Sequence, residues 1–363
     1  MRKIFFYILL LQLHFSSTAQ SGREFSNWIF ADNNTFYFPD TASDPVVSNN
    51  PTLNIVNSTY GLNDYPITTC VSDSNGNLQF YTAKGTIWNK NFRLMQGSEL
   101  IDSLSMFPFA IKRPNRSHYC ISSKYAIDMD IDSGRGGVVE DNRCFTVTFS
   151  DYINHPSKRF VWLLESRVSQ FDSTLYIYAY KFTQNGIDSN DVIISKALKF
   201  PHKITINSSI VNIRLARACK ISPDGKYLIV HGIDVYNSLT DDFGNLWNDR
   251  RILLLDFDIE TGIAHNPRQI KVPFHQGYYN QPHVSGIEFS RSYNYFYLSL
   301  NYYAHPDLGL YQCPVTIVND TLLTNACHKV IGNGMHSITN LRLAYNKKIY
   351  LSRDTYMQSG ILQ

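Results

Sequence analysis

Short hydrophobic stretches separated by turn-forming residues recur along the whole chain, and they predict β-strands. The clearest examples are rich in Tyr, Phe, Leu, Ile or Val, are bounded by Gly, Asn, Asp, Pro or Ser, and cover residues 175–182, 227–230, 252–257, 295–300 and 348–351. Beyond the first residues, no stretch keeps the helical period. No low-complexity linker interrupts the pattern, so the sequence predicts one continuous all-β domain over residues 20–363.

One short pattern recurs within these stretches and predicts how the strands pair. It consists of an apolar residue, one or two small or polar residues, a turn, and then a strand of aromatic or aliphatic residues. The copies are VSDSNGNLQFYT from Val71, IKRPNRSHYCIS from Ile111, ISPDGKYLIVHG from Ile221, FSRSYNYFYLSL from Phe289 and LAYNKKIYLSR from Leu343, with a looser copy over 155–164. Asn-Gly and Asp-Gly reverse a chain tightly because they tolerate positive φ, so each copy predicts a hairpin.

The spacing of the copies indicates the architecture. They recur at roughly 40 to 70 residues, around or above the period of propeller blades. A hairpin alone is marginally stable, whereas blades stacked around an axis bury their faces. We therefore predict a WD40-like β-propeller of about six or seven blades. A β-sandwich is the alternative, but it explains the repeated turn less well.

The two ends of the propeller raise the question of ring closure. The last blade is expected to be incomplete, because the chain reaches Gln363 inside it. The segment from Trp28 to Phe38 is the candidate strand that closes the ring by pairing with the last blade.

The first residues have the three parts of a secretory signal peptide. Arg2 and Lys3 are positive, Ile4 to Leu13 are mostly apolar, and Ser17-Thr18-Ala19 offers a cleavage site, so residues 1–19 are predicted to be removed. A membrane anchor is the weaker alternative, because the apolar run is about half of the roughly 20 residues that span a bilayer. The protein is therefore expected to be exported, and secreted or held at the cell surface.

Composition and charge limit the classes of partner that the sequence predicts. Charged residues make up 17% of the chain and the net charge is +3, with no cluster of Lys and Arg, so a nucleic-acid partner is not expected. No later stretch is long and apolar enough to span a membrane.

The six cysteines allow disulfides in an exported protein. No CxxC occurs, so the sequence does not favour zinc. Cys313 and Cys327 flank an expected hairpin turn at Asn319-Asp320 and are the candidate pair. The alternative, which we favour from sequence, is that most of the cysteines are small buried residues.

No residue pattern predicts catalysis. The chain has no GxSxG, HExxH or P-loop, and its histidines are scattered, so we predict a non-enzymatic protein without a required cofactor. The one metal candidate is calcium at Asp128, Asp130 and Asp132, which alternate ahead of Gly134 as in calcium loops. The twelfth position of such a loop wants Glu and holds Val139, so a solvated acidic loop is the favoured alternative.

Longer stretches resemble a known family. They are Asn27-Trp28-Ile29-Phe30-Ala31, SDSNGNLQFYT over 72–82, GTIWNKNFRLM over 85–95, and the landmarks at 222–225, 286–290 and 341–350. Over nearly the whole mature chain they resemble the exported propeller proteins of gliding and related Bacteroidetes. The resemblance implies that PKD-type modules and a sorting domain for type IX secretion follow the propeller. The chain is therefore expected to be a C-terminally truncated or divergent member.

These observations favour a binding or scaffold module that presents propeller loops to a protein or polysaccharide at the cell surface. Tyr and Trp on exposed loops suit such contacts, and the candidate residues are Trp88 and Asn89 in one loop and Trp247 and Asn248 in another. Trp88 equally fits a core position. The alternatives are a glycoside hydrolase-like enzyme on the same fold, with two convergent carboxylates at the axis, and a purely structural segment of an adhesin.

Overall fold

The structure of the chain is a computed structural model in which the described residues form strands and turns. It describes residues 27–29, 34–40, 43–49, 69–83, 86–100, 110–122, 124–144, 150–169, 174–199, 213–214, 218–240, 246–270, 283–301, 309–315, 327–331, 338–344, 346–353 and 360–362. No α-helix occurs in these ranges, and two short 3-10 turns lie at Ser98–Leu100 and Asp132–Gly134. The predicted signal peptide lies outside the described residues.

The described strands form seven antiparallel sheets, numbered in chain order. The first sheet contains β1 (Asn27–Ile29), β2 (Asn34–Tyr37) and β3 (Val46–Asn49), and the second contains β4 (Thr69–Ser72), β5 (Leu78–Ala83) and β6 (Thr86–Asn89). The third contains β7 (Ile111–Lys112), β8 (His118–Cys120), β9 (Tyr125–Asp128) and β10 (Gly137–Glu140). The fourth contains β11 (Asp151–Asn154), β12 (Phe160–Val168), β13 (Thr174–Thr183) and β14 (Gly186–Lys199).

The remaining three sheets continue in the same way. The fifth contains β15 (Ile213–Arg214), β16 (Ala218–Ile221), β17 (Tyr227–Thr240), β18 (Leu246–Asp258) and β19 (Ile263–Ile270). The sixth contains β20 (His283–Phe289), β21 (Tyr295–Asn301), β22 (Gly309–Pro314) and β23 (His328–Ile331). The seventh contains β24 (Ile338–Leu343), β25 (Ile349–Arg353) and β26 (Gly360–Leu362).

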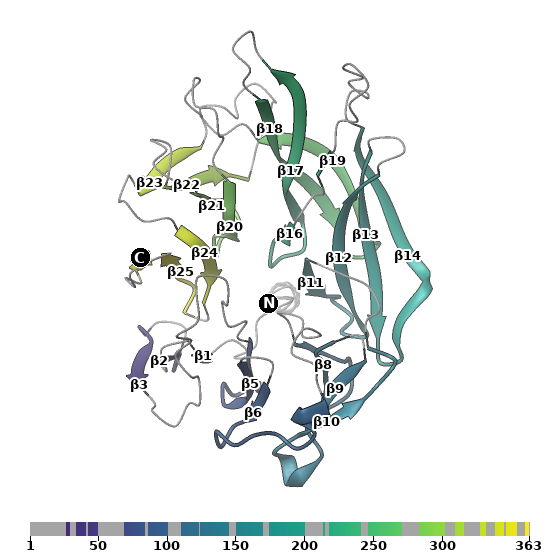
Figure 1. Cartoon of the computed structure of the whole chain (residues 1–363), viewed down its shortest axis with the longest axis vertical. Helices are drawn as coiled ribbons and strands as arrows, with labels where there is room; N and C mark the ends of the chain where they lie inside the picture. Colours follow the sequence, from purple (N-terminus) through teal and green to yellow (C-terminus); the bar gives the residue numbers. More distant parts are fainter. Residues whose placement is uncertain are drawn as a thin grey trace, which may run out of the picture.

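The sheets follow one another around a common centre in the order of the chain (Figure 1). Apolar side chains of successive sheets share cores, for example Phe80 with Tyr119, Leu163 with Cys120, Leu164 with Leu253, Ile229 with Phe296, and Leu310 with Leu341. This is a β-propeller arrangement, so the predicted all-β propeller fold is confirmed. Five blades are recognised in it, so the predicted count of six or seven is not confirmed.

The first and seventh sheets meet through side chains. The rings of Phe38 and Tyr350 lie edge to face with centroids 5.3 Å apart. Lys348 Nζ donates to Asp44 Oδ1 at 2.7 Å, and Asn346 Nδ2 donates to the carbonyl oxygen of Ser43 at 3.0 Å. Among the described strands, the expected pairing of the Trp28–Phe38 segment with the last blade is not found: β1 and β2 pair with each other and β2 pairs with β3.

The repeated sequence pattern forms the same turn in six sheets. In the fifth sheet, Ser222 N donates to Tyr227 O, and Gly225 N donates to Ser222 O, both at 2.8 Å. Equivalent backbone bonds begin at Asp73, Arg113, His155, Ser290 and Ala344. Each turn contains one residue with positive φ, at Gly76, Asn115, Lys158, Gly225, Tyr293 or Lys347. The copy at His155 is therefore a full member of the series, although its sequence is the loosest.

Four of the six cysteines form two disulfides. Cys313 of β22 bonds to Cys327, and Cys120 of β8 bonds to Cys144. Cys70 and Cys219 are not part of a disulfide. The sequence preference for mostly unpaired cysteines is therefore wrong for these four. Cys120 and Cys144 lie 24 residues apart, and no turn pattern connects them in the sequence.

Candidate functional site

Three charged side chains from successive sheets meet at the middle of the ring. Asp151 lies on β11, Lys220 on β16 and Glu288 on β20, which are inner strands of the fourth, fifth and sixth sheets (Figure 1). Lys220 Nζ lies 3.7 Å from Asp151 Oδ2 and 3.5 Å from Glu288 Oε2. We name these three residues the central charged chain.

Both carboxylates also bind the backbone of the next sheet. Asp151 Oδ2 accepts from Ile221 N at 3.0 Å, and Glu288 Oε2 accepts from Leu343 N at 3.1 Å. Ile221 and Leu343 occupy the same place in the repeat, directly before the turn. An inner strand leaves N–H groups on its free edge, and a buried N–H without a partner is costly. The two carboxylates therefore tie neighbouring sheets together at the centre.

The lysine between them remains charged. Burial disfavours the ammonium of Lys220, but Asp151 and Glu288 outweigh that effect, so the pKa of Lys220 is raised. Both carboxylate side chains are at most 8% exposed, so an unpaired charge here would be expensive. The central charged chain is thus held together by opposite charges that are partly removed from water.

The chemistry available at this place is limited. Lys220 is protonated, so it offers no free amine, and each carboxylate already accepts a backbone hydrogen bond. The nearby thiol of Cys219 is buried and donates to the carbonyl oxygen of Leu164 at 3.5 Å. Burial raises the pKa of Cys219, so its reactive thiolate form is disfavoured. These residues fit a structural role better than general acid–base or nucleophilic catalysis.

The sequence contains a signal for the central charged chain, separate from the repeated turn. The three residues before successive turns read Cys-Lys-Ile, Ile-Glu-Phe and Leu-Arg-Leu, so a charge of alternating sign stands between two apolar residues each time. These charges are Lys220, Glu288 and Arg342. Only the closure of the sheets around a centre makes them neighbours.

The first predicted binding pair is largely occupied inside the second sheet. Asn89 is 4% exposed, and its Oδ1 accepts from the backbone N of Asn91 at 2.9 Å and of Arg93 at 3.2 Å. Trp88 is half-buried, and its ring is nearly parallel to that of Tyr81, with centroids 6.3 Å apart. Asn89 therefore stabilises a turn, and Trp88 belongs to an apolar cluster.

The second predicted pair lies in a strand and not in a loop. Trp247 and Asn248 belong to β18, where they stand opposite Asn237 and Tyr236 of β17. This part of the β17–β18 hairpin lies beyond the stretch of β17 that pairs with β16. The expectation of a loop is corrected, because the turn between these strands starts further along β17 than the sequence indicated.

The three aspartates of the predicted calcium loop have separate partners. Asp128 Oδ2 lies 3.3 Å from His118 Nε2, Asp130 accepts from the hydroxyl of Ser117, and Asp132 pairs with Arg135. Within the described ranges, no group of three or more His, Cys, Asp or Glu side chains is arranged to hold a metal ion. The structure thus does not gather these carboxylates at one point.

A different surface results from unequal strand lengths. Strands β8 and β9 of the third sheet have 3 and 4 residues, whereas β12 and β13 of the fourth have 9 and 10. The third sheet shares a core with one end of the fourth, where Leu163, Tyr180 and Phe182 are buried. It is too short to cover the other end.

Five side chains share the remaining end of this face. The strand register places Arg167 opposite Tyr176, Tyr176 opposite Lys196, and Tyr178 opposite Ile194. Ile194 is 56% exposed, Arg167 and Lys196 are exposed, and the two tyrosines are half-buried. We name Arg167, Tyr176, Tyr178, Ile194 and Lys196 the open face of the fourth sheet.

The same end of the sheet is buried on its other side. There Val168, Leu175, Ile177 and Ala197 are at most 6% exposed, packed in the core shared with the fifth sheet. The open face is also ordered by its own contacts. Arg167 donates to both carboxylate oxygens of Glu165, at 2.6 and 2.7 Å, and its guanidinium lies 5.2 Å from the ring centroid of Tyr178. These contacts position the Arg167 and Tyr178 side chains relative to each other on the open face.

Comparisons with known proteins find similarity to solved structures at low sequence identity. No protein-family model matches the chain, and no curated protein matches it. Hydrazine synthase from Kuenenia stuttgartiensis is similar at 10% identity and TM-score 0.46, covering 96% of this chain and 98% of that one. The Cps50 (Swd1) β-propeller domain from Myceliophteria thermophila is similar at 10% identity and TM-score 0.40, covering 93% and 96%.

A third similar solved structure is a gluconolactonase. The periplasmic gluconolactonase PpgL from Pseudomonas aeruginosa has 13% identity and TM-score 0.37, and the match covers 66% of this chain and 62% of that one. In the described part of the chain, no helix is long and apolar enough to cross a membrane. Similarity at this level carries no inference about activity, so the function has to follow from the residues of the chain itself.

Proposed function

We propose that the chain is a non-enzymatic binding module that docks a partner protein on the open face of the fourth sheet. The observation that carries the proposal is the cluster of Tyr, Arg and Ile where the third sheet is too short to cover the fourth. Tyr and Arg are enriched among residues that dominate binding energy, and surrounding apolar contacts exclude water.

The geometry favours a protein over a polysaccharide. The ring of Tyr178 has the Arg167 guanidinium over it, and it lies nearly parallel to Tyr180 with centroids 6.1 Å apart. Its faces are thus covered by this chain's own residues, which leaves little room for a sugar ring to stack. The exposed Ile194 and Lys196 offer an apolar contact beside a charge, as an interface does.

The enzyme alternative predicts a general acid and a second carboxylate at the axis. Two carboxylates do approach each other there, but Lys220 lies between them and each accepts a backbone N–H. This arrangement supports a structural role for Asp151 and Glu288. Hydrolysis of a polysaccharide that is lost in Asp151→Asn and in Glu288→Gln, with both variants folded, would favour the enzyme instead.

The binding proposal is tested with one charge on the open face. Ile194→Asp places a carboxylate at an exposed position, so the fold should tolerate it, and binding of the labelled chain to cells of the source organism should fall at least tenfold. Val47→Asp is the matched control, because Val47 is 59% exposed on β3 of the first sheet. Equal binding by the wild type and both variants would contradict the proposal.

Treatment of the cells identifies the class of partner. Proteolysis of the cell surface should abolish binding, whereas periodate oxidation of its glycans should leave binding unchanged. The reverse pattern would indicate a polysaccharide. If untreated cells bind nothing, the purely structural role in an adhesin is the better reading.

We further propose that the seven sheets are seven blades of an exported propeller of the Bacteroidetes type described above. The contacts of Ser43 and Asp44 with Asn346 and Lys348 support a ring that closes between the first and seventh sheets. A zero-length cross-linker should join Asp44 to Lys348 in the folded chain and not in urea. N-terminal sequencing of protein from the culture medium should begin at Gln20, and recovery of the uncleaved chain from cells would contradict export.

A further inference from the structure

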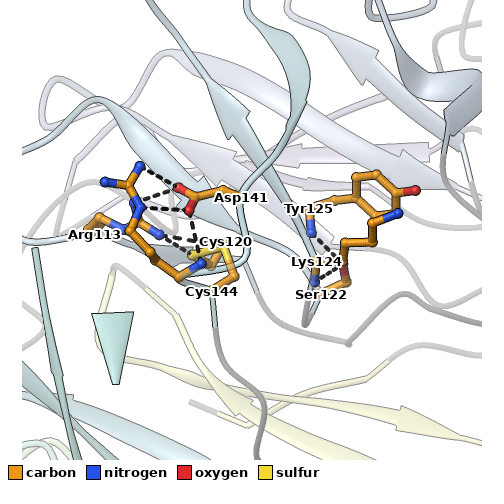
Figure 2. Close-up of a disulfide and its surroundings, with 8 residues drawn as sticks. Arg113, Cys120, Ser122, Lys124, Tyr125, Asp141 and Cys144 are labelled. Carbon is orange, nitrogen blue, oxygen red and sulfur yellow. Dashed lines mark hydrogen bonds and ion pairs between the residues drawn. A yellow bond between two sulfur atoms is a disulfide. The ribbon is translucent and has the colours of Figure 1, made fainter. Parts of the chain in front are cut away.

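The third sheet contains a buried cation against its disulfide (Figure 2). Arg113 follows β7 and is 0% exposed, and its Nη2 lies 3.5 Å from Cys120 Sγ and 3.7 Å from Cys144 Sγ. Its Nη1 donates to Asp141 Oδ2 at 2.6 Å. A buried guanidinium is expensive unless it is paired, so the aspartate explains how the cation is tolerated. It does not explain why the cation faces sulfur.

Arg113 is not the only cation that pairs with Asp141. Arg143 Nε also donates to Asp141, at 2.9 Å, so two guanidinium groups share one carboxylate. Burial disfavours the ionised carboxyl, but Arg143 and Arg113 outweigh it and lower the pKa of Asp141 to about 2. The carboxylate is therefore ionised at neutral pH and is shared by both guanidinium groups, while the Nη2 group of Arg113 is directed at the two sulfur atoms.

The two sulfur atoms differ in position. Cys120 lies in the central strand β8 and is 0% exposed, whereas Cys144 ends a surface turn in which its N donates to Asp141 O at 3.0 Å. The intervening residues Asn142 and Arg143 are exposed. Cys144 is itself 2% exposed, but it directly follows the exposed Arg143, whereas Cys120 is flanked by the buried Tyr119 and Ile121. A nucleophile therefore reaches Cys144 first.

We propose that Cys120–Cys144 is the reducible disulfide of this chain, attacked at Cys144 by a dithiol reductant while Arg113 holds the displaced Cys120 thiolate. One thiolate of the dithiol bonds to Cys144 Sγ, the Cys120–Cys144 bond breaks, and its electron pair leaves on Cys120. The second thiol of the dithiol loses its proton and displaces Cys144, which takes up a proton. The dithiol is oxidised to its disulfide, and the protein disulfide is reduced by two electrons.

Arg113 favours this reaction because a guanidinium stabilises a thiolate far more than it stabilises a neutral disulfide sulfur. A better leaving thiolate speeds exchange, and a stabilised reduced state makes the disulfide more oxidising. The second disulfide of the chain is the internal standard. Cys313 and Cys327 are buried to a similar degree, and no ion pair or hydrogen bond to a cationic side chain is recorded for either among the described residues.

The test equilibrates the full chain with a graded ratio of reduced to oxidised dithiothreitol, blocks free thiols and quantifies each disulfide by peptide mass spectrometry. Cys120–Cys144 should be half-reduced at a ratio at least tenfold lower than Cys313–Cys327. Equal ratios, or earlier reduction of Cys313–Cys327, would overturn the proposal. Attack at Cys144 is checked separately with glutathione, whose mixed disulfide should form on Cys144 and not on Cys120.

Variants isolate the cation. Arg113→Met combined with Asp141→Asn removes both buried charges together, and the tenfold preference should disappear. Arg143→Gln removes the exposed guanidinium, which has no recorded contact with either sulfur atom, and should keep most of the preference. A preference that survives in the double variant would show that Arg113 is not its cause. If the double variant does not fold, the order of reduction and the glutathione site in the wild type still decide the question.

Discussion

Removal of the Glu288 carboxylate tests whether the central charged chain holds the ring together. Glu288 is 4% exposed, accepts from Leu343 N and faces Lys220. Glu288→Gln keeps an oxygen that can accept from Leu343 N but removes the charge. Glu288→Ala removes both. The two variants therefore separate the backbone hydrogen bond from the ion pair.

The expected magnitudes follow from these contacts. Lys220 keeps Asp151 in both variants and its side chain is 30% exposed, so loss of the second counter-ion should cost about 1–2 kcal/mol in Glu288→Gln, less than a fully buried pair. Glu288→Ala also leaves Leu343 N without this acceptor, which adds about 1–3 kcal/mol. We expect total losses in the free energy of unfolding of about 1–2 kcal/mol for Glu288→Gln and about 2–5 kcal/mol for Glu288→Ala.

Urea unfolding followed by circular dichroism measures both losses. Glu140→Gln is the matched control, because Glu140 pairs with Lys124 on the surface with both side chains more than half exposed, and such a pair contributes within about 0.5 kcal/mol. Lys220→Met should cost about 1 kcal/mol less in the Glu288→Gln background than in the wild type, and this difference measures the coupling between Lys220 and Glu288. If Gln and Ala lose the same free energy, the bond to Leu343 does not matter. If neither Glu288 variant differs in stability from Glu140→Gln, the central charged chain does not stabilise the packing of the sheets.

Three further predictions concern the turns and a buried histidine. Gly225→Ala should lower the free energy of unfolding by about 2 kcal/mol, because φ at this position is 71° and the added Cβ would lie 2.5 Å from Ile259 Cδ1; a change below about 0.5 kcal/mol in urea would contradict this. Lys158→Gly should instead stabilise by about 0.5–1 kcal/mol, because Lys158 has a φ of 57° and glycine adopts it without strain, while Lys158→Ala should be neutral in the same assay. Burial lowers the pKa of His231 to about 4 from 6.5, so as pH falls the unfolded chain is protonated at His231 before the folded chain. The contribution of His231 to the free energy of unfolding is therefore intact above pH 6.5, and roughly 3 kcal/mol of it is lost between pH 6.5 and 4. His231→Phe should flatten the pH profile of the free energy of unfolding over that window, and a parallel profile would contradict the argument.

Much of the fold could be predicted because its signals are local. The residues Ser222-Pro-Asp-Gly predict the turn after Ile221, and hydrogen bonds among those residues form it in the structure. The copy at His155 was the hardest to recognise, because Lys158 occupies the positive-φ position that Gly225 fills elsewhere. Backbone bonds and the contacts between His155 and Ser157 form this turn, and the Lys158 side chain carries no sign of it.

The candidate site was much less predictable. Asn89 reads as a polar loop residue, but its amide is used by the backbone of its own turn. Trp247 reads as a loop residue, but β18 extends through it. The open face of the fourth sheet could not be foreseen, because it depends on the third sheet being shorter than the fourth and adjacent to it.

The sequence by itself determined the strands, the repeated turn and the propeller class, because turn residues and strand patterning act over a few positions. Only the tertiary structure decided which residues meet. Asp151, Lys220 and Glu288 are separated by about 70 residues each, and they become neighbours because sheets packed around one centre bring their inner strands together. Arg113 looked like part of a surface turn, and the packing of β8 with the turn that ends at Cys144 placed it against a disulfide.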